Sequence, residues 1–550
     1  MGTTYRWAQP VLVREQRTLF QPTLDDMIPQ DHEVRLLDET LRPLDWSMWE
    51  SKYKRGGPGQ PPIHPRVLAG IWLYAMMRRL RTSRPLEYAC GHNLDFMWLG
   101  EGRTPDYSTL ATFFSSNKEP LKDLFKQVCR KAMTMGMVRL GEVGFDATRV
   151  KAANSRYATL TTPSIEKKLA AIDAQIDAIA EATATALEDA ATTGFGAGTE
   201  LPEGLKSLEE RRKKLAELAE VARTRDEARR QSGTDPKKKP AQVPTTDPQS
   251  KVMPNKEGGY APNYTPTALT DGASGIILDA NVLDVVNESG EALPAVDRVT
   301  ELCGEAPENF LSDGGNASGE ILAGLEERDV NAVVPVKSMV PGADSPALRD
   351  DLTQSVPADQ WEQLPRNSLG QLDKSSFIYD AERSVYHCPG GRELPYESRE
   401  NRNGVERMCY RSLNCDGCPL VALCLQKKKD GEPATGTDGR VRNIRRDAYA
   451  AVRERAAQRM ATPESKAQYA RRSPIAETPF AWLKGVLGLR QFRHVGLEKV
   501  ETEWRWACLT MNLKKILSVL ARLRRLALDA LSAAGQPTTE PPTAEIGLAV

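Results

Sequence analysis

The order of strand and helix patterns between residues 264 and 336 constrains the fold more strongly than any other feature of the sequence. Two stretches rich in β-branched and apolar residues, 264–270 and 275–286, flank a turn-forming DGAS segment and therefore predict a hairpin. Helix and strand patterns then alternate, at 292–304, 309–313, 317–329 and 331–336. Such an alternation predicts an α/β domain in which helices cover a sheet.

Acidic residues end two of the predicted strands. Asp146 ends a short strand within 141–150, and Asp313 ends the strand after the first helix. The order β, β, β, α, β, α, β predicts an RNase H-like mixed sheet, whose neighbouring first and fourth strands bring both aspartates to one edge. Glu477 opens a later helix that can reach the same edge. Three carboxylates without a nearby histidine suit Mg²⁺ or Mn²⁺, and two such ions would stabilise an in-line phosphodiester displacement.

Glu477 also has a purely local interpretation. Ser473 can cap a helix, Pro474 suits the first helical position, and Glu477 would then occupy the first turn, where an acid is favourable. The sequence alone leaves this alternative open.

Further units surround the predicted core. Isoleucine and leucine recur in steps of three and four on either side of a glycine-rich turn, which predicts an antiparallel helical hairpin. The sequence predicts a helical N-terminal DNA-binding domain at 1–135 and the first part of the core at 136–337. This first part contains the hairpin at 163–231 and a polar, proline-rich loop at 232–262. A β-rich, cysteine-containing insertion at 338–465, C-terminal core helices at 466–530 and a disordered tail at 531–550 follow.

Charge is balanced overall but not locally. The chain has 74 Lys and Arg against 74 Asp and Glu. Residues 51–90 carry eight basic residues against one acidic residue, and residues 425–490 carry 15 against seven. These two blocks predict surfaces for an anionic polymer, with ordinary solvated helix faces as the alternative. No run of about 18 apolar residues and no apolar signal core is present, which predicts a soluble intracellular protein without a membrane partner.

Three segments carry a resemblance to a known family. Residues 143–155 (VGFDATRVKAANS), 310–322 (FLSDGGNASGEIL) and 469–494 resemble the three DDE boxes of bacterial insertion-sequence transposases, in the group that includes the eleven-eighty-two family. Residues 61–114 resemble the helical N-terminal domain of those enzymes. The resemblance extends from about residue 20 to about residue 525, nearly the whole chain.

The resemblance implies a function and partners. Asp146, Asp313 and Glu477 would form a catalytic triad holding Mg²⁺ or Mn²⁺. The enzyme would bind double-stranded DNA at the element's terminal inverted repeats, cleave it and join the freed 3′ end to target DNA. A homodimer on DNA and a bacterial cytoplasmic, nucleoid-associated location are also implied. A catalytically inactive DNA-binding descendant and a metal-dependent nuclease that does not join strands are the alternatives.

The family's third box carries Tyr, Arg, Glu and Lys, which correspond here to Tyr469, Arg472, Glu477 and Lys484. The gap between Glu477 and Lys484 matches the common form. The gap between Arg472 and Glu477 is one residue longer, so that either or both of Arg471 and Arg472 would meet DNA phosphate. The predicted DNA contacts are therefore Tyr469, Arg471, Arg472 and Lys484.

Cysteines cluster in the predicted insertion. Cys415, Cys418 and Cys424 form a CxxC knuckle with a third thiol, and Cys388 precedes a Pro-Gly turn. Four thiolates at this spacing predict one tetrahedral, structural Zn²⁺. Cys409 and His387 are alternative fourth ligands, and reduced thiols packed in a small core are the alternative to a metal site.

Overall fold

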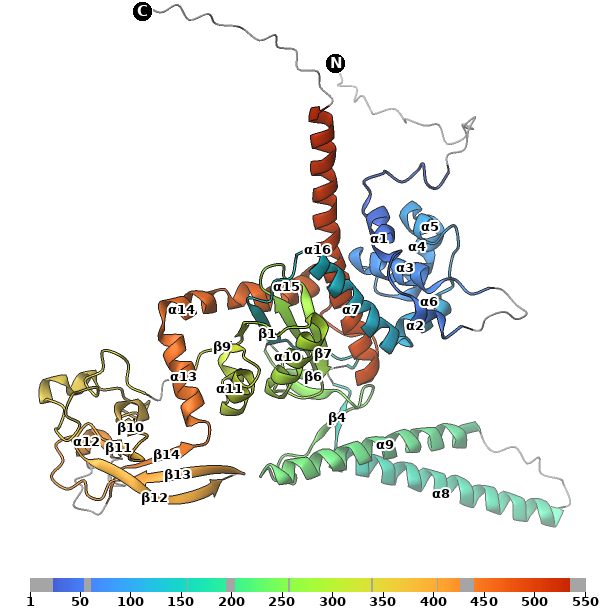
Figure 1. The fold of residues 1–550 in the computed structure, drawn as a ribbon. Coiled ribbons are helices and arrows are strands. Elements are labelled where there is room, and N and C mark those ends of the chain that lie inside the picture. The colour runs from blue at the N-terminus through green and yellow to red at the C-terminus, as the bar shows by residue number, and fades with distance from the viewer. Residues whose placement is uncertain are drawn as a thin grey trace, which may run out of the picture. The chain divides into compact units, whose positions relative to one another are not determined.

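The structure is a computed structural model that describes residues 23–53, 61–155, 157–193, 203–255, 258–337, 340–402, 404–425 and 440–534. Figure 1 shows the fold, coloured along the chain. The chain divides into two compact units. Unit 1 comprises residues 1–128 and 506–550, and unit 2 comprises residues 129–505. None of the helices in these ranges is both long enough and apolar enough to cross a membrane.

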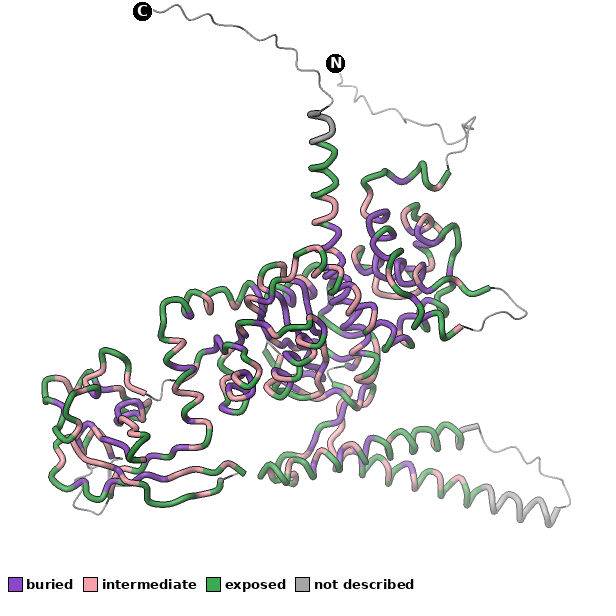
Figure 2. The backbone as a smooth tube through the Cα atoms, in the orientation of Figure 1, coloured by how far each residue is buried: buried purple, intermediate pink, exposed green. Residues whose placement is uncertain are grey.

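Unit 1 is helical, as its sequence predicts. Its most buried helix has apolar residues on all sides, and every residue from Val67 to Met76 is buried (Figure 2). His64 caps that helix by accepting the Arg66 N–H, and Pro65 occupies its first turn. The helices of this region are α1 (Glu33–Leu41), α2 (Ser47–Glu50), α3 (Pro65–Met77), α4 (Ser83–His92), α5 (Leu94–Leu99), α6 (Tyr107–Ser115) and α7 (Lys118–Thr134), which continues into unit 2.

The part of the long helix α16 (Leu497–Ala534) from Trp506 onward completes the core of unit 1. The Trp506 ring stacks on Phe114 with centroids 5.5 Å apart, and its Nε1 donates to the Phe114 carbonyl at 3.2 Å. The sequence predicts that residues 466–530 are C-terminal core helices, whereas residues from Trp506 onward belong to compact unit 1. The helix also continues to Ala534, into the predicted tail; the rest of that tail lies outside the described residues.

The main sheet of unit 2 is mixed. Its order is β2-β6-β1-β8-β9, with β5 and β7 also paired to β6. β1 (Val143–Ala147) runs antiparallel to β6 (Tyr260–Asp271) and parallel to β8 (Asn309–Leu311), which is parallel to β9 (Asn331–Val333). The expected pairing of the first and fourth core strands is therefore present. The other elements are β2 (Val150–Lys151), β7 (Ile277–Leu283), α10 (Ala292–Cys303) and α11 (Gly319–Glu326).

Residues 232–262 are not simply a loop. They contain β4 (Gln242–Pro244), β5 (Lys251–Pro254) and the beginning of β6. β4 pairs with β3 (Thr159–Thr161), and β5 pairs with β6. The prolines and polar residues of these segments predict a loop. Both strands are short, however, and an edge strand tolerates proline because it pairs on one side only, so the missing N–H leaves no neighbouring strand without a donor.

Two long helices, α8 (Thr162–Thr193) and α9 (Glu203–Gln231), form the predicted hairpin (Figure 1). Ile165 near the start of α8 packs with Leu218 and Ala222 near the end of α9, so the helices are antiparallel. At the base, the Asp226 carboxylate accepts the Thr162 hydroxyl and the Ala241 N–H. The seam thus has a buried base, which fixes the hairpin to the strands beside it.

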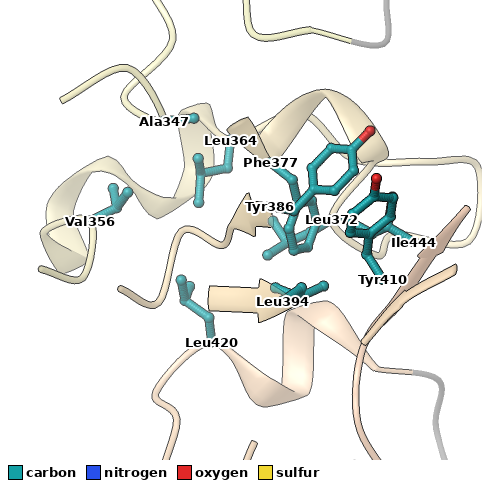
Figure 3. Packing of buried hydrophobic residues seen from close by; sticks show 10 residues of the cluster. All are labelled: Ala347, Val356, Leu364, Leu372, Phe377, Tyr386, Leu394, Tyr410, Leu420 and Ile444. Carbon is teal, nitrogen blue, oxygen red and sulfur yellow. The ribbon is translucent and has the colours of Figure 1, made fainter. Parts of the chain in front are cut away.

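Residues 378–447 form a second, antiparallel sheet of order β10-β11-β12-β13-β14. Its core packs aliphatic residues against Phe377, Tyr386 and Tyr410 (Figure 3). The strands are β10 (Ile378–Asp380), β11 (Val385–His387), β12 (Glu393–Arg402), β13 (Val405–Arg411) and β14 (Asn443–Asp447), with the short helix α12 (Val421–Cys424) between the last two. The β-rich character of this segment agrees with its sequence.

A helical stretch leads from β14 to the predicted third acid. It comprises α13 (Ala450–Ala461), α14 (Pro463–Ala470), the π-helical turn η5 (Ser473–Glu477) and α15 (Thr478–Gly485). Thr462 caps α14 by accepting the Ser465 N–H. Pro474 removes one backbone donor from the turn that η5 occupies, which weakens regular α-helical bonding there.

Candidate functional site

Asp146 lies near the end of the central strand β1. Val143, Phe145 and Ala147 are buried, whereas Asp146 alternates to a more open position. Its side chain is 14% exposed, and Oδ1 accepts the Ala147 N–H at 2.8 Å. The carboxylate is therefore held by its own strand but remains reachable from solvent.

Asp313 lies on the neighbouring strand end. β1 and β8 pair with Val143 opposite Phe310 and Gly144 opposite Leu311. Continuing this register by two residues aligns Asp313 with Asp146, although β8 itself ends at Leu311, two residues earlier than its sequence predicts. Asp313 also caps the following turn, because its Oδ1 accepts the Gly315 N–H at 2.9 Å. The structure therefore carries both aspartates to one edge of the sheet.

Glu477 reaches this edge because its helical turn sits directly on β1. A Cβ atom placed on Gly144 would lie 2.7 Å from Ile475 Cγ2 and 3.0 Å from the Ala476 backbone nitrogen. Only glycine permits this approach, two residues before Asp146 in the strand. Ile475 is buried with Leu311 and Val333, so the turn also packs on β8 and β9.

The local interpretation of Glu477 as a first-turn acid is wrong. The helical stretch begins at Pro463, and no side chain caps η5 at its start. Ser473 instead donates from its hydroxyl to Glu477 Oε2 at 3.1 Å. Glu477 is in mid-helix, and its side chain is 48% exposed. Dipole stabilisation at a helix start therefore gives no reason for an acid at this position.

Arg472 lies between two of the three acids. Its Nη2 donates to Glu477 Oε1 at 2.7 Å, and its Nη1 is 4.0 Å from Asp146 Oδ2. The neighbouring Arg471 forms an ion pair with Glu142, with Nε 3.1 Å from Oε2. The two arginines therefore have different environments, and only Arg472 bridges predicted site residues.

Lys484 and Tyr469 flank the acids differently. Lys484 Nζ donates to the Thr148 hydroxyl at 2.6 Å and to the Arg149 carbonyl at 2.9 Å, just beyond the end of β1. Tyr469 is half-buried and packs against the apolar cluster that includes Ile475. Lys484 is thus placed on the edge that holds Asp146, whereas the ring of Tyr469 supports the π-helical turn.

The carboxylates match the oxygen ligands that Mg²⁺ and Mn²⁺ prefer. Register and the shared Arg472 guanidinium bring them to one region. Across the described ranges, however, no three Asp, Glu, His or Cys side chains converge closely enough to hold a metal ion. The donor chemistry fits a divalent cation, while an arginine lies between two of the three side chains, Asp146 and Glu477.

A second cluster contains the four predicted zinc ligands. Cys388, Cys415, Cys418 and Cys424 all line one cavity of about 20 Å³ in the β10–β14 region. The Cys418 N–H bonds the Cys415 carbonyl at 3.3 Å, and the Arg392 N–H donates to Cys388 Sγ at 3.3 Å. The four thiols are therefore gathered but, like the acids, are not at ligand geometry.

Burial governs the chemistry of these thiols. It raises the pKa of Cys388, and it raises the pKa of Cys424 to about 12, with the neighbouring cysteines adding to the shift. The alternative ligands are elsewhere: Cys409 is buried in β13 and His387 in β11, and neither lines the cavity. The structure separates the set of four from both alternatives.

Sequence reasoning missed three residues that shape the acidic site. Gly144 allows the π-helical turn to touch β1, Glu142 binds Arg471, and Thr148 receives Lys484. A glycine inside a strand is a signal of close backbone approach and could have indicated the first. Nothing in the sequence pattern pairs Glu142 or Thr148 with residues more than 300 positions away.

Two family models match the chain. Residues 387–517 match a model described as a transposase DDE domain, and residues 22–116 match a transposase domain (DUF772). The first match includes Glu477 and all four cavity cysteines, and the second covers most of the helical region of unit 1. A search of curated proteins gives no match.

Proposed function

We propose that the chain is an insertion-sequence DDE transposase that binds the ends of the element and performs metal-dependent DNA cleavage and strand transfer. The matches of residues 387–517 and 22–116 to two transposase family models support this proposal. The observation that supports the proposal is the pairing of β1, which carries Asp146, with β8, which precedes Asp313, together with the packing of the Glu477 turn on Gly144 of β1. This arrangement supports an RNase H-like core, and transposases act on DNA.

The three acids would hold the divalent cations. Such ions, when bound, stabilise the charge that develops on the attacking and leaving oxygens of a phosphodiester. The protein's own part would be to position two acids near neighbouring strand ends and the third on the π-helical turn that packs on β1. The first attacking group would be water and the second the freed 3′ hydroxyl, and no covalent enzyme intermediate is required.

Basic residues would hold the DNA backbone beside the acids. Lys484 already reaches the end of β1, and Arg471 and Arg472 belong to the same helical stretch. Guanidinium groups bind phosphate oxygens through paired N–H donors. Tyr469, although half-buried, lies next to them on α14. We further infer that a homodimer pairs two element ends and that unit 1 recognises their sequence.

The decisive experiment uses a labelled duplex that carries one terminal repeat of the element encoding this chain, plus a supercoiled target. Wild-type protein with Mg²⁺ should cut at the repeat and join the cut end to the target. Asp146→Asn should bind the duplex and do neither. Cutting without joining would establish the nuclease alternative, and binding without cutting by the wild type would establish the inactive descendant.

We also propose that Cys388, Cys415, Cys418 and Cys424 hold one structural Zn²⁺. The support is their convergence on one cavity from two segments of chain, together with the N–H group already directed at Cys388. A closed set of four thiolates leaves no position for water, so the metal would stabilise the β10–β14 region and take no part in cleavage. Elemental analysis of protein purified without added metal should find close to one zinc per chain.

A further inference from the structure

Arg472 occupies an unusual position for a residue expected to bind DNA. Its side chain is only 16% exposed, while the Glu477 side chain that it contacts is 48% exposed. The Arg472 guanidinium faces both acids, with Nη2 2.7 Å from Glu477 Oε1 and Nη1 4.0 Å from Asp146 Oδ2. Its charge is thus directed at two of the proposed metal ligands.

The backbone maintains this arrangement. Arg472 and Glu477 are five residues apart, and in an α-helix of 3.6 residues per turn such side chains point about 140° away from each other. The π-helical turn η5 widens the helix at this point and returns the two side chains to one face. Ile475 and Ala476, packed on Gly144, hold the turn in place. The pairing therefore depends on a specific backbone feature in contact with β1.

A guanidinium and a divalent cation would compete for the same oxygens. Asp146 and Glu477 are both acidic, and bringing them together is unfavourable unless a positive charge lies between them. Arg472 supplies that charge here, between Asp146 and Glu477. The metal ions of the proposed function would supply the same charge by direct ligation.

We propose that Arg472 is a positioning residue that stands in for the metal. In the metal-free protein it holds Glu477 toward Asp146, and a divalent cation must displace it to ligate Glu477. The displaced guanidinium then becomes available to a DNA phosphate beside the same acids. This inference rests on the proposed function, because it requires the acids to be metal ligands.

The test measures Mn²⁺ binding to the full chain without DNA, by calorimetry and by electron paramagnetic resonance. Arg472→Ala should bind Mn²⁺ about tenfold more tightly than the wild type, because the ion no longer displaces a charge-assisted hydrogen bond. Its metal-free melting temperature should fall, and Mn²⁺ should raise that temperature more than it does for the wild type. Arg471→Ala, which breaks the adjacent pair with Glu142, is the matched control and should change Mn²⁺ affinity less than about twofold.

Unchanged or weaker Mn²⁺ binding by Arg472→Ala would overturn the inference. If that variant does not fold, Arg472→Lys retains the charge but loses the forked donors, and tighter Mn²⁺ binding is again expected; wild-type affinity in this variant would overturn the inference equally. Asp146→Asn distinguishes a failure of the proposed metal site from a failure of the role proposed for Arg472. If it binds Mn²⁺ as well as the wild type, the proposed metal site fails, whereas weakened binding by Asp146→Asn without tightening by Arg472→Ala refutes only the role of Arg472.

Discussion

The acidic edge of the main sheet and the cysteine cavity of the second sheet differ in every physical respect. The acids come from positions 146, 313 and 477, and Glu477 is about half exposed. The cysteines come from one 37-residue span, 388–424, and line a small, largely apolar cavity. Open oxygen ligands are typical of catalytic ions that keep water, and closed thiolates are typical of structural zinc. The same protein therefore offers two sites whose loss should have opposite consequences for activity and stability.

The largest expected effect is the loss of cleavage on replacing an acid. Asp146→Asn, Asp313→Asn and Glu477→Gln should each reduce strand cleavage by about 10³-fold or more, because each removes an oxygen that stabilises the charged transition state. DNA binding and zinc content should be unchanged. Rates are measured in single turnover on a pre-nicked element end. Cleavage within tenfold of the wild type would remove that residue from the site.

Gly144→Ala should have the next largest effect on cleavage. The new methyl group would collide with Ile475 and the Ala476 backbone, displacing the turn that carries Glu477 at a cost of about 1–3 kcal/mol. A displacement of this kind should slow cleavage by about 10- to 100-fold. Gly290→Ala is the control, since no atom of the described residues lies within 4 Å of a Cβ placed there. Equal rates for the two variants would show that the contact with β1 does not position Glu477.

Replacing a cavity cysteine should have the opposite pattern. Cys415→Ser or Cys418→Ser should abolish zinc binding and lower the melting temperature of the β10–β14 region, with a smaller effect on the chemistry of pre-nicked DNA. Cys409→Ser, which alters a buried cysteine outside the cavity, should retain zinc. Wild-type protein that contains no zinc, or that loses it without destabilisation, would contradict a structural metal.

The pH dependence of the cavity follows from its buried thiols. Zinc binding requires thiolates, so zinc affinity should rise with pH. In the metal-free protein the pKa of Cys424 is raised from 9.0 to about 12, so its burial contributes stability below pH 9 that is lost as pH rises toward 12. Metal-free protein should therefore lose stability over this range, and zinc-loaded protein should lose less. Denaturant titration at several pH values measures both.

A smaller effect is expected for one basic residue. If Lys484 contacts a phosphate, Lys484→Ala should reduce the slope of log K against log salt by about one. Lys213→Ala, on the exposed surface of α9, should leave the slope unchanged. If both variants keep the wild-type slope, the hydrogen bonds of Lys484 to Thr148 and Arg149 are its whole role.

The smallest effect concerns the helical hairpin. Removing about one heptad from each of α8 and α9, beyond their buried base, should leave cleavage of pre-nicked DNA intact, since the described seam residues, such as Ile165, Leu218 and Ala222, are apolar. Circular dichroism verifies that the shortened protein folds. Loss of cleavage in a folded variant would give the hairpin a direct part in the reaction.

Local patterns in the chain predict the candidate site residues and account for much of the observed secondary structure. The hairpin of β6 and β7, the helix α10 and the parallel pairing of β1 with β8 all follow from period and order in the chain. The grouping of Cys415, Cys418 and Cys424 follows from short spacing, which keeps side chains close whatever the surrounding fold. Local patterns are informative here because the interactions they specify span few residues.

Only the tertiary structure decided the features that depend on distant contacts. The strands β4 and β5 form because other strands pair with them, although their own composition favours a loop. The part of α16 from Trp506 onward packs in unit 1, which its amphipathic pattern alone does not indicate. Arg472 meets Glu477 because packing of Ile475 and Ala476 on Gly144 stabilises a π-helical turn. Each of these three features depends on the surface against which the segment packs, and residues far away in the chain form that surface.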